Sequence, residues 1–330
     1  MMLPSPREPR AHRRAAVLLG ALLCLLGCQG RPPPTDDTCP TGDCETPGPG
    51  GAPIDVRPEG SLRVAAFNVH RLFDTVCDSG ACGGSNYEEQ PSPEVLAAQA
   101  DQLAQAISRL DADVVLLAEV ETEASLKELL DRLPRFQHAE LGETGTPASV
   151  DVAVLSIHPI LETRRHRERV LTRPDGSWTY FSRELLEVHV DAPDARAIVF
   201  SAHFRSKVND DPGRRYAEAD AARDIVATAA RENPDAIVVL GGDLNDVPGS
   251  EPIVALEKEG HLLRVASDRP ESETWTYSYS GNRQAIDHLF LARGGGTYVP
   301  GSFKAKRDST RGGYGGSDHA AVYADFVRAP

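Results

Sequence analysis

Short apolar runs that alternate with segments of helical periodicity constrain the fold of this chain more than any other feature. Apolar side chains recur at helical spacing over residues 93–110, Asp113–Val120 is a continuous apolar run of buried-strand type, and Thr122 is placed to cap a following helix. No internal repeat interrupts the pattern. We therefore expect one mixed α/β domain over residues 61–330. Further strands are expected at 62–69, 150–156, 182–190, 197–203, 236–241, 274–279, 285–291 and 320–326, with helices at about 215–230 and 251–259.

Composition excludes several protein classes. A hydrophobic content of 40% and a net charge of −14 are typical of a globular protein and not of a disordered or fibrous one. No apolar run long enough to span a bilayer follows the first 30 residues, which excludes a protein with several membrane spans. Because the chain is acidic, a polyanionic ligand must be met by a local basic patch.

The N-terminus is typical of an export signal. Four basic residues precede an apolar run at 15–26, and the run ends in Leu25-Leu26-Gly27-Cys28, a pattern similar to a bacterial lipoprotein signal. We expect cleavage of residues 1–27, lipidation of Cys28, and a protein anchored at the outer membrane or cell surface or released from it. An ordinary signal peptide that contains a cysteine is the alternative. The basic residues are Arg7, Arg10, Arg13 and Arg14.

Residues 28–60 are rich in Pro and Gly, a composition that favours a tether over a packed domain. Two closely spaced cysteine pairs follow the signal region, Cys39 with Cys44 and Cys77 with Cys82. In an exported chain such pairs indicate two small disulfide loops. A zinc site is the weaker alternative, because neither pair has the C-x-x-C spacing.

Polar residues stand at the ends of the expected strands, where loops present side chains on a rigid frame. If these strands pack side by side, their carboxylates, imidazoles and amides converge, which would be costly without a metal ion or charged ligand. Carboxylates are natural ligands for Mg²⁺, and imidazoles suit proton transfer and charge stabilisation at a phosphoryl group. The residues concerned are Asn68, Glu119, His203, Asp243, Asn245, Asp287, Asp318 and His319.

The ordered set of motifs over residues 61–327 resembles the endonuclease/exonuclease/phosphatase superfamily, in its deoxyribonuclease-like, secreted bacterial branch. The motifs are FNV at 67–69, AEVE at 118–121, HFRSK at 203–207, GGDLN at 241–245, IDHLFLA at 286–292 and SDH at 317–319. The resemblance implies an α/β four-layered sandwich, in which two stacked mixed β-sheets are flanked by helices. GGDLN followed by a terminal SDH is its most specific part.

The resemblance also implies roles in metal binding. Glu119 would be the principal ligand of Mg²⁺ or Mn²⁺, with Asn68 beside it and Asp318 completing the set. The family often carries an acidic residue two positions after the first Asn, where this chain has His70. That departure favours Mn²⁺ if His70 reaches the metal. In the other interpretation, which we prefer, His70 only hydrogen-bonds near the site.

The catalytic roles that the resemblance implies fall on five residues. Asp243 would orient or deprotonate the attacking water, and Asn245 would donate a hydrogen bond to it or to a phosphorus oxygen. His319 would contact the phosphate, with its tautomer set by Asp287. His203 would be a second catalytic histidine, and Asp151 is a candidate to orient it. His288 is expected on the opposite strand face, in a structural role.

Two basic loops are expected around the site and would contact substrate phosphates. One carries Arg205, Lys207, Arg214 and Arg215, and the other carries Lys304, Lys306, Arg307, Arg311 and several glycines. Solvated loop charges are the alternative. Tyr277 and Tyr279 could stack on bases, but alternate positions on one sheet face explain them equally well.

These observations predict a monomeric, metal-dependent phosphodiester hydrolase, most simply a nuclease that acts on DNA or RNA outside the cytoplasm. Family members that act on lipid head groups or small phosphoesters share the motifs, so a phosphatase or phosphodiesterase of that kind is the alternative. A catalytically silent surface-binding lipoprotein is a third hypothesis. It is disfavoured because Glu119, Asp243 and His319 are all present.

Overall fold

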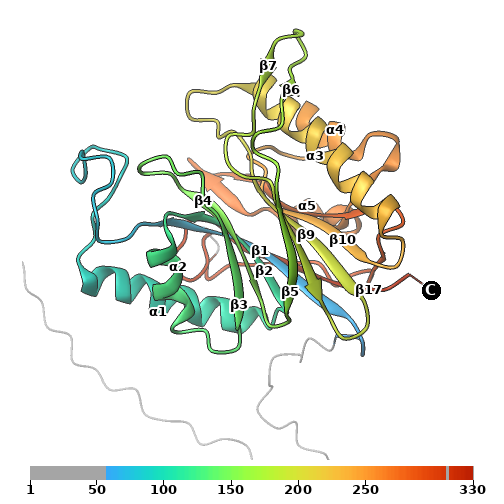
Figure 1. The fold of residues 1–330 in the computed structure, drawn as a ribbon, viewed down its shortest axis with the longest axis horizontal. Coiled ribbons are helices and arrows are strands. Elements are labelled where there is room, and N and C mark those ends of the chain that lie inside the picture. Colours follow the sequence, from blue (N-terminus) through green and yellow to red (C-terminus); the bar gives the residue numbers. More distant parts are fainter. Residues whose placement is uncertain (1–56, 310–311, 330) are drawn as a thin grey trace, which may run out of the picture. The chain divides into compact units, whose positions relative to one another are not determined.

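Two mixed β-sheets packed face to face form the centre of the protein (Figure 1). The computed structural model describes residues 57–309 and 312–329. The first sheet has the order β15-β17-β1-β2-β4-β3, with β16 also paired to β17, and the second has the order β11-β14-β10-β9-β8-β5. The first sheet comprises β1 (Leu62–Leu72), β2 (Val114–Val120), β3 (His138–Gly142), β4 (Asp151–Ser156), β15 (Thr297–Tyr298), β16 (Lys304–Lys306) and β17 (Ala321–Val327). The second comprises β5 (Ile160–Arg165), β8 (Leu186–Asp191), β9 (Arg196–His203), β10 (Ile237–Asp243), β11 (Leu262–Arg264) and β14 (Asp287–Ala292).

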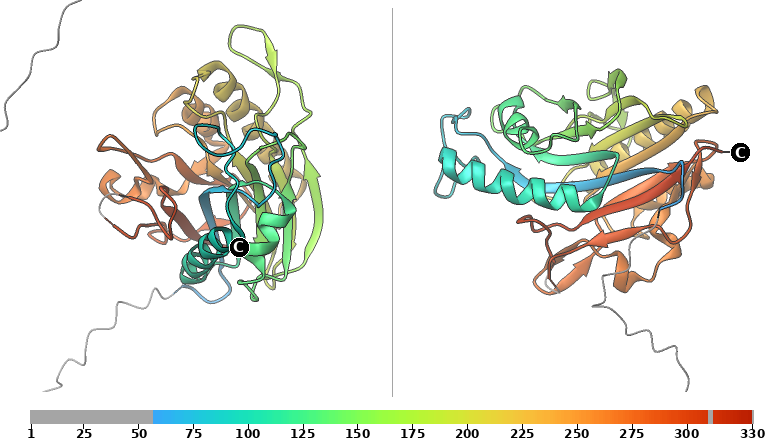
Figure 2. Two further views of the ribbon diagram at one scale, coloured as in Figure 1. Left: turned by 90° about the vertical axis from the view of Figure 1, so that its left-hand side faces the viewer. Right: turned by 90° about the horizontal axis from the view of Figure 1, so that it is seen from below.

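Helices cover the outer face of each sheet (Figure 2). Successive side chains of a strand point to opposite faces, so Ala65 and Phe67 of β1 pack under the first pair of helices while Val64 and Ala66 face the other sheet. Three apolar layers result, one between the sheets and one under each helix pair, and the expected four-layered sandwich is confirmed. The helices are α1 (Pro93–Leu110) and α2 (Glu123–Leu130) on the first sheet, α3 (Pro212–Glu232) and α4 (Glu251–Glu257) on the second, and the short α5 (Glu271–Thr274).

Local sequence signals set several helix ends. The Ser92 hydroxyl accepts a hydrogen bond from the amide of Val95 at the start of α1, and Thr122 and Ser125 form a capping box at the start of α2. The helix expected at 251–259 ends earlier, at Glu257. Glu259 lies in the left-handed region with φ 54°, which a continuing α-helix does not allow.

The structure corrects some expected strands. The expected strand at 274–279 is replaced by α5 and the short β12 (Tyr277–Tyr279), which pairs with β13 (Asn282–Gln284). β8 begins at Leu186 and not at Ser182. The sequence did not predict β3, β5, or the hairpin of β6 (Leu171–Thr172) and β7 (Trp178–Thr179). β3 and β5 are edge strands with polar and half-exposed residues, so they lack the apolar signal of central strands.

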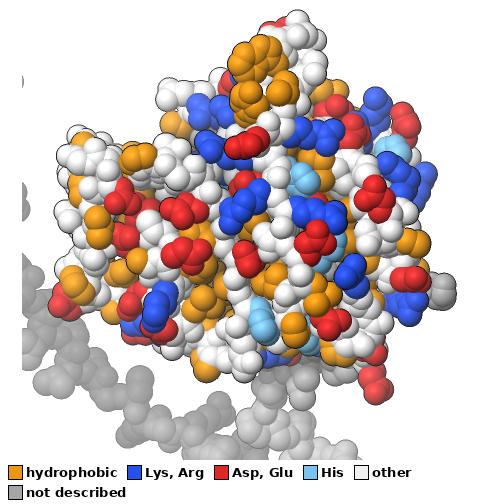
Figure 3. Space-filling view, in the orientation of Figure 1, with side chains coloured by type: hydrophobic (Ala, Val, Ile, Leu, Met, Phe, Trp, Pro, Cys, Tyr) orange, Lys and Arg blue, Asp and Glu red, His pale blue; other side chains and the backbone are white. Residues whose placement is uncertain are grey.

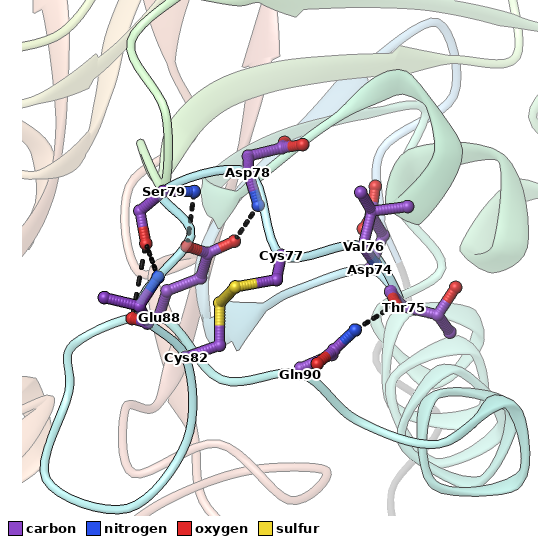
Figure 4. Close-up of a disulfide and its surroundings, with 10 residues drawn as sticks. Asp74, Thr75, Val76, Cys77, Asp78, Ser79, Cys82, Glu88 and Gln90 are labelled. Carbon is purple, nitrogen blue, oxygen red and sulfur yellow. Dashed lines mark hydrogen bonds between the residues drawn. A yellow bond between two sulfur atoms is a disulfide. The ribbon is translucent and has the colours of Figure 1, made fainter.

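The Cys77–Cys82 disulfide is present, with the two Cα atoms 5.9 Å apart (Figure 4). Glu88 lies against it and accepts hydrogen bonds from the amides of Asp78 and Ser79, which holds the loop in shape. A zinc site at this pair is therefore excluded. Cys39 and Cys44, the signal region, Cys28 and nearly all of the expected tether lie outside the described residues and stay predictions. Within 57–309 and 312–329, no helix is long and apolar enough to cross a membrane.

A buried ion pair joins the two central antiparallel strands of the first sheet. Arg63 Nε donates to Asp325 Oδ1 at 2.7 Å and Nη2 donates to Oδ2 at 3.1 Å. We predict that Asp325→Ala lowers the free energy of unfolding by about 3–5 kcal/mol, because it leaves the Arg63 charge buried without its carboxylate. Asp235→Ala removes the carboxylate of an exposed pair with Arg328 and should cost about 0–1 kcal/mol. Equal urea midpoints for the two variants would contradict this prediction.

A second prediction concerns acid stability. Burial would raise the pKa of Glu187, but hydrogen bonds with His166 and His189 outweigh it and lower the pKa from 4.5 to about 2. The ionised carboxylate therefore stabilises the fold above about pH 4.5, and this contribution fades as the pH falls toward 2. Glu187→Gln should lower the free energy of unfolding by about 1–3 kcal/mol at neutral pH, with a smaller difference from the wild type in acid. Urea titrations at several pH values, with exposed Glu232→Gln as control, test this, and a pH-independent difference would refute it.

Candidate active site

Strand direction brings the predicted polar residues to one end of the sandwich. β1 runs parallel to β2, and β9 runs parallel to β10, so Asn68, Glu119, His203 and Asp243 all lie near the carboxyl ends of their strands. β14 and β17 run antiparallel to β10 and β1, and therefore begin where those strands end. Asp243 is in register with both His203 and Asp287.

Asn68 joins the two sheets at this end. Its Nδ2 donates to Glu119 Oε1 at 3.1 Å within the first sheet and to Asp243 Oδ2 at 3.0 Å in the second sheet. Its Oδ1 accepts from the amide of His70 at 2.9 Å. In this arrangement Asn68 orients the two carboxylates through its amide nitrogen, so its predicted role as a metal ligand through Oδ1 would require the amide to turn over.

The backbone around these residues is strained. Glu119, His70, Arg71 and Asn245 all have φ between 52° and 70°, in the left-handed region that side chains other than glycine seldom adopt. The strain lets the amide of Arg71 donate to Glu119 Oε2, and the amide of Asn245 donate to Asp243 Oδ1, both at 2.9 Å. Such strain persists where surrounding structure enforces it, and it clusters at functional sites.

Glycine is required directly before Asp243. Gly242 has φ 140°, and a Cβ there would lie 1.9 Å from the carbonyl oxygen of Ala202 on β9. The close approach of the two backbones leaves no room for a side chain. Because Gly242 allows this approach, β10 stays paired with β9 up to its last residue, Asp243.

His319 and Asp287 form the pair that the sequence predicted. His319 Nδ1 lies 2.9 Å from Asp287 Oδ2, and its Nε2 lies 4.0 Å from Asp243 Oδ2. Burial would lower the pKa of His319, but the Asp287 carboxylate outweighs it and raises the pKa to about 10. The His319 side chain is therefore held as a positively charged imidazolium. One of its N–H groups points toward Asp243, the carboxylate that the family resemblance implies would act on the attacking water.

His203 is fully buried, and its Nε2 lies 3.6 Å from Asp243 Oδ2. Burial, reinforced by the positive Arg183 and His319, holds the pKa of His203 well below its ordinary value. The expectation that Asp151 orients His203 is wrong. Asp151 Oδ2 accepts from Thr144 and Ser149, while His203 Nδ1 and Asp151 Oδ1 have no hydrogen-bond partner.

Asp243 is surrounded by these groups and almost entirely buried. Burial and the neighbouring Asp287 carboxylate raise the pKa of Asp243 to about 7. A carboxylate whose pKa lies near neutrality can accept a proton and release it again at physiological pH, as a general base must.

His70 forms a hydrogen bond beside the site and is not one of the candidate metal ligands. Its Nδ1 lies 2.9 Å from Asp318 Oδ1, and this bond raises the pKa of His70. Burial would raise the pKa of Asp318, but the bond with His70 outweighs it and lowers the pKa. The geometry agrees with the interpretation that His70 hydrogen-bonds near the site, and it identifies Asp318 as the partner. His288 is buried on the other face, where its Nε2 lies 2.9 Å from the carbonyl oxygen of Asp246, and burial lowers its pKa to about 4.

The donor set fits a divalent cation. Glu119, His203 and Asp243 each offer a ligand atom within 4.8 Å of the others, and so do Asp243, Asp287 and His319. The Oδ1 atom of Asp287 is buried without a hydrogen-bond partner. Several converging carboxylates in a buried setting suit a hard cation, which would offset their mutual repulsion.

The site opens into a cleft of about 1120 Å³. The predicted residues Arg205 and Lys207 line it, as do Tyr277 and Tyr279, and the Tyr277 ring lies 4.9 Å from the His319 ring. Three further cations line the cleft that the sequence analysis did not identify: Arg71, Arg167 and Arg183. No motif marks Arg167 or Arg183, because both lie in segments between the strands that carry the predicted site residues.

Arg215 is not a cleft residue, and its predicted role in substrate binding is wrong. Its side chain is only 2% exposed, because it lies on the inner side of α3 and donates to Asp246 and Asp210. The prediction that the second basic loop lies around the site is also wrong. Lys304–Lys306 form β16 on the first sheet, and Arg307 packs over the Trp275 ring, outside the cleft lining. Arg311 lies outside the described residues.

The chain belongs to the endonuclease/exonuclease/phosphatase family, whose model matches residues 65–319. Members of this family are metal-dependent hydrolases of phosphodiester bonds. No curated protein matches the chain in sequence.

Three solved structures illustrate the shared fold. Truncated TDP2 from Caenorhabditis elegans has a TM-score of 0.58 and 17% identity, covering 81% of this chain and 97% of that one. TDP2 from D. rerio, complexed with a single-strand DNA product, has a TM-score of 0.57 and 19% identity, covering 81% and 99%. SmcL has a TM-score of 0.57 and 21% identity, covering 81% and 99%. At such identities the likeness establishes the fold alone.

We predict that Asp243→Asn raises the melting temperature of the metal-free protein at about pH 8, because it removes a charge buried beside Asp287. The same change, or Glu119→Gln, should reduce the stabilisation that Mg²⁺ or Mn²⁺ gives the wild type. Calorimetry in chelator and then in excess metal measures both effects. Exposed Asp235→Asn is the control and should change neither. An undiminished metal response in both site variants would contradict the assigned donor set.

Proposed function

We propose that this protein is a divalent-metal-dependent nuclease, which hydrolyses phosphodiester bonds of DNA or RNA by attack of water on phosphorus. The observation that carries the proposal is the pairing of two side chains. Buried Asp243, which has a pKa of about 7, lies beside the imidazolium of His319. A base and a cation fixed within 4.0 Å of each other suit activation of water next to a negatively charged phosphate.

In this proposal each step of the reaction is assigned to particular side chains of the protein. Asp243 accepts a proton from the attacking water, and the amide of Asn68 holds its Oδ2 in place. His319, oriented by Asp287, donates to a phosphate oxygen as negative charge develops there. Asn245 lines the cleft and is placed to orient water or substrate. A divalent cation held by Glu119, with Asp318 nearby, would neutralise phosphate charge and favour departure of the leaving oxygen.

A nucleic-acid substrate is supported by charge. The protein is acidic overall, with a net charge of −14, yet Arg71, Arg167, Arg183, Arg205 and Lys207 line the cleft. Cations concentrated in a cleft attract a polyanion and hold successive phosphates. The similarity to D. rerio TDP2, whose structure contains a single-strand DNA product, is consistent with this substrate class.

The place of action is part of the proposal. An N-terminal basic and apolar segment ending at Cys28 supports export and lipid anchoring, and the Cys77–Cys82 disulfide is consistent with an oxidising compartment. We propose that the enzyme acts as a monomer at the cell envelope or after release from it.

Incubation of the full chain with supercoiled plasmid, in Mg²⁺ or Mn²⁺ and then in chelator, tests the proposal. We expect metal-dependent nicking that falls by roughly 10³-fold or more in Asp243→Ala, because the base is lost. Asp235→Ala, at an exposed position that follows the C-terminal end of α3 and does not line the cleft, should be fully active. If the folded wild type cleaves neither DNA nor RNA with either metal, the nuclease proposal fails and phospholipid and small phosphoester substrates become the leading candidates.

A further inference from the structure

The hairpin of β6 and β7 exposes a face of unusual composition. Trp178 is 68% exposed, Val170 59% and Tyr180 40%, whereas Leu171 and Thr179, which pair with each other, are buried, Leu171 in the apolar layer under α3. This alternation places the exposed side chains on one outer face of the hairpin. Figure 3 shows hydrophobic side chains gathered on the projection that Figure 1 labels β6 and β7. The Trp178 and Tyr180 rings meet edge to face, with centroids 5.6 Å apart.

The hairpin is fastened to the cleft wall. Arg214, which lines the cleft, donates from Nε to the carbonyl oxygen of Tyr180 at 3.1 Å. Arg173 forms a two-pronged pair with Asp211 at the start of α3, at 3.0 and 2.7 Å. Both contacts join the hairpin to the start of α3, directly after the loop that carries Arg205 and Lys207.

The exposed face is also close to the cleft along the chain. Ser182 and Arg183 line the cleft directly after the hairpin. Arg183 comes five positions after Trp178, so their Cα atoms are at most about 18 Å apart. The aromatic face is therefore within a few nucleotides of the cleft wall.

The charges beside the hairpin favour one class of occupant. Arg167, Arg183, Arg205 and Arg214 line the cleft, and Figure 3 shows Lys and Arg side chains, with some acidic ones among them, beneath the hairpin. These guanidinium groups lie in the wall of a hollow, where a flexible polyanion can reach them and a flat lipid surface cannot. A single-stranded nucleic acid carries both phosphates and flat bases. Its phosphates can contact the cations in the cleft while its bases stack on the aromatic rings outside the cleft.

We propose that Trp178, together with Tyr180, is a stacking platform for the bases of a single-stranded nucleic acid whose scissile phosphate lies in the cleft. The inference rests on the proposed nuclease function and extends it, because it makes the enzyme prefer single strands long enough to reach the hairpin. In a duplex the bases are paired and stacked inside, and the platform has no free base faces to contact.

The first test compares substrates of two lengths in the full-length enzyme. Trp178→Ala should lower kcat/KM for an oligodeoxynucleotide of about 20 nucleotides by about 5- to 100-fold relative to kcat/KM for a dinucleotide, the range expected for loss of one stacked base. Trp178→Phe should retain most of the preference for the longer substrate. Val254→Ala removes another exposed apolar side chain, from α4, and should leave the ratio unchanged. An unchanged ratio in Trp178→Ala, or an equal loss on both substrates, would overturn the platform.

The second test needs no catalysis. The chain has two tryptophans, and Trp275 is buried, so the fluorescence lost in Trp178→Phe reports on Trp178. In chelator and low salt, the same oligonucleotide should quench this component with saturation. Quenching without cleavage by the wild type would support the platform while refuting the nuclease proposal. Response to vesicles containing phosphatidylserine, with none to the oligonucleotide, would overturn the platform in favour of a lipid-binding hairpin.

Discussion

The buried amide of Asn68 is the contact on which the geometry of the site depends. It is the point where the first sheet, through Glu119, and the second sheet, through Asp243, share one hydrogen-bonding group. The apolar layer between the two sheets is non-directional and does not fix the position of a carboxylate to within a fraction of an ångström. The Asn68 amide supplies that direction at the site, and its buried, low-dielectric surroundings strengthen its hydrogen bonds.

The site is assembled at the expense of local stability. Left-handed backbone at Glu119 and Asn245, and two carboxylates buried side by side at Asp243 and Asp287, each disfavour the folded state. The rest of the sandwich offsets this cost, through three apolar layers and the buried Arg63–Asp325 pair. Burial and the neighbouring Asp287 carboxylate destabilise the fold, but they also raise the pKa of Asp243 toward neutrality. The destabilising features at this end of the sandwich therefore contribute to the chemistry of the site.

The cleft walls show how a fold shared across a family can be directed to a substrate. Near the carboxyl ends of the strands the family motifs recur, whereas the cations of the wall come from segments between them, such as Arg167 and Arg183. The hairpin of β6 and β7 and the disulfide loop that precedes Tyr87 also lie between the segments that carry the motifs. We expect such connecting segments to determine the substrate, because the catalytic motifs alone leave it open.

Sequence patterns determined the central strands, α1, the Thr122 cap of α2, and the identities of Glu119, Asp243, Asp287 and His319, because these depend on apolar periodicity, local capping and short motifs. Tertiary structure alone decided the rest. Arg215 and Arg183 look alike in the sequence, yet the first is buried against Asp246 and the second lines the cleft. Asn68 bonds to a carboxylate 175 residues away, and Lys304–Lys306 pair with β17 and do not line the cleft. Which way a polar side chain points depends on the sheet edge or helix face that packs against it, and such contacts between distant segments leave no local periodicity in the chain.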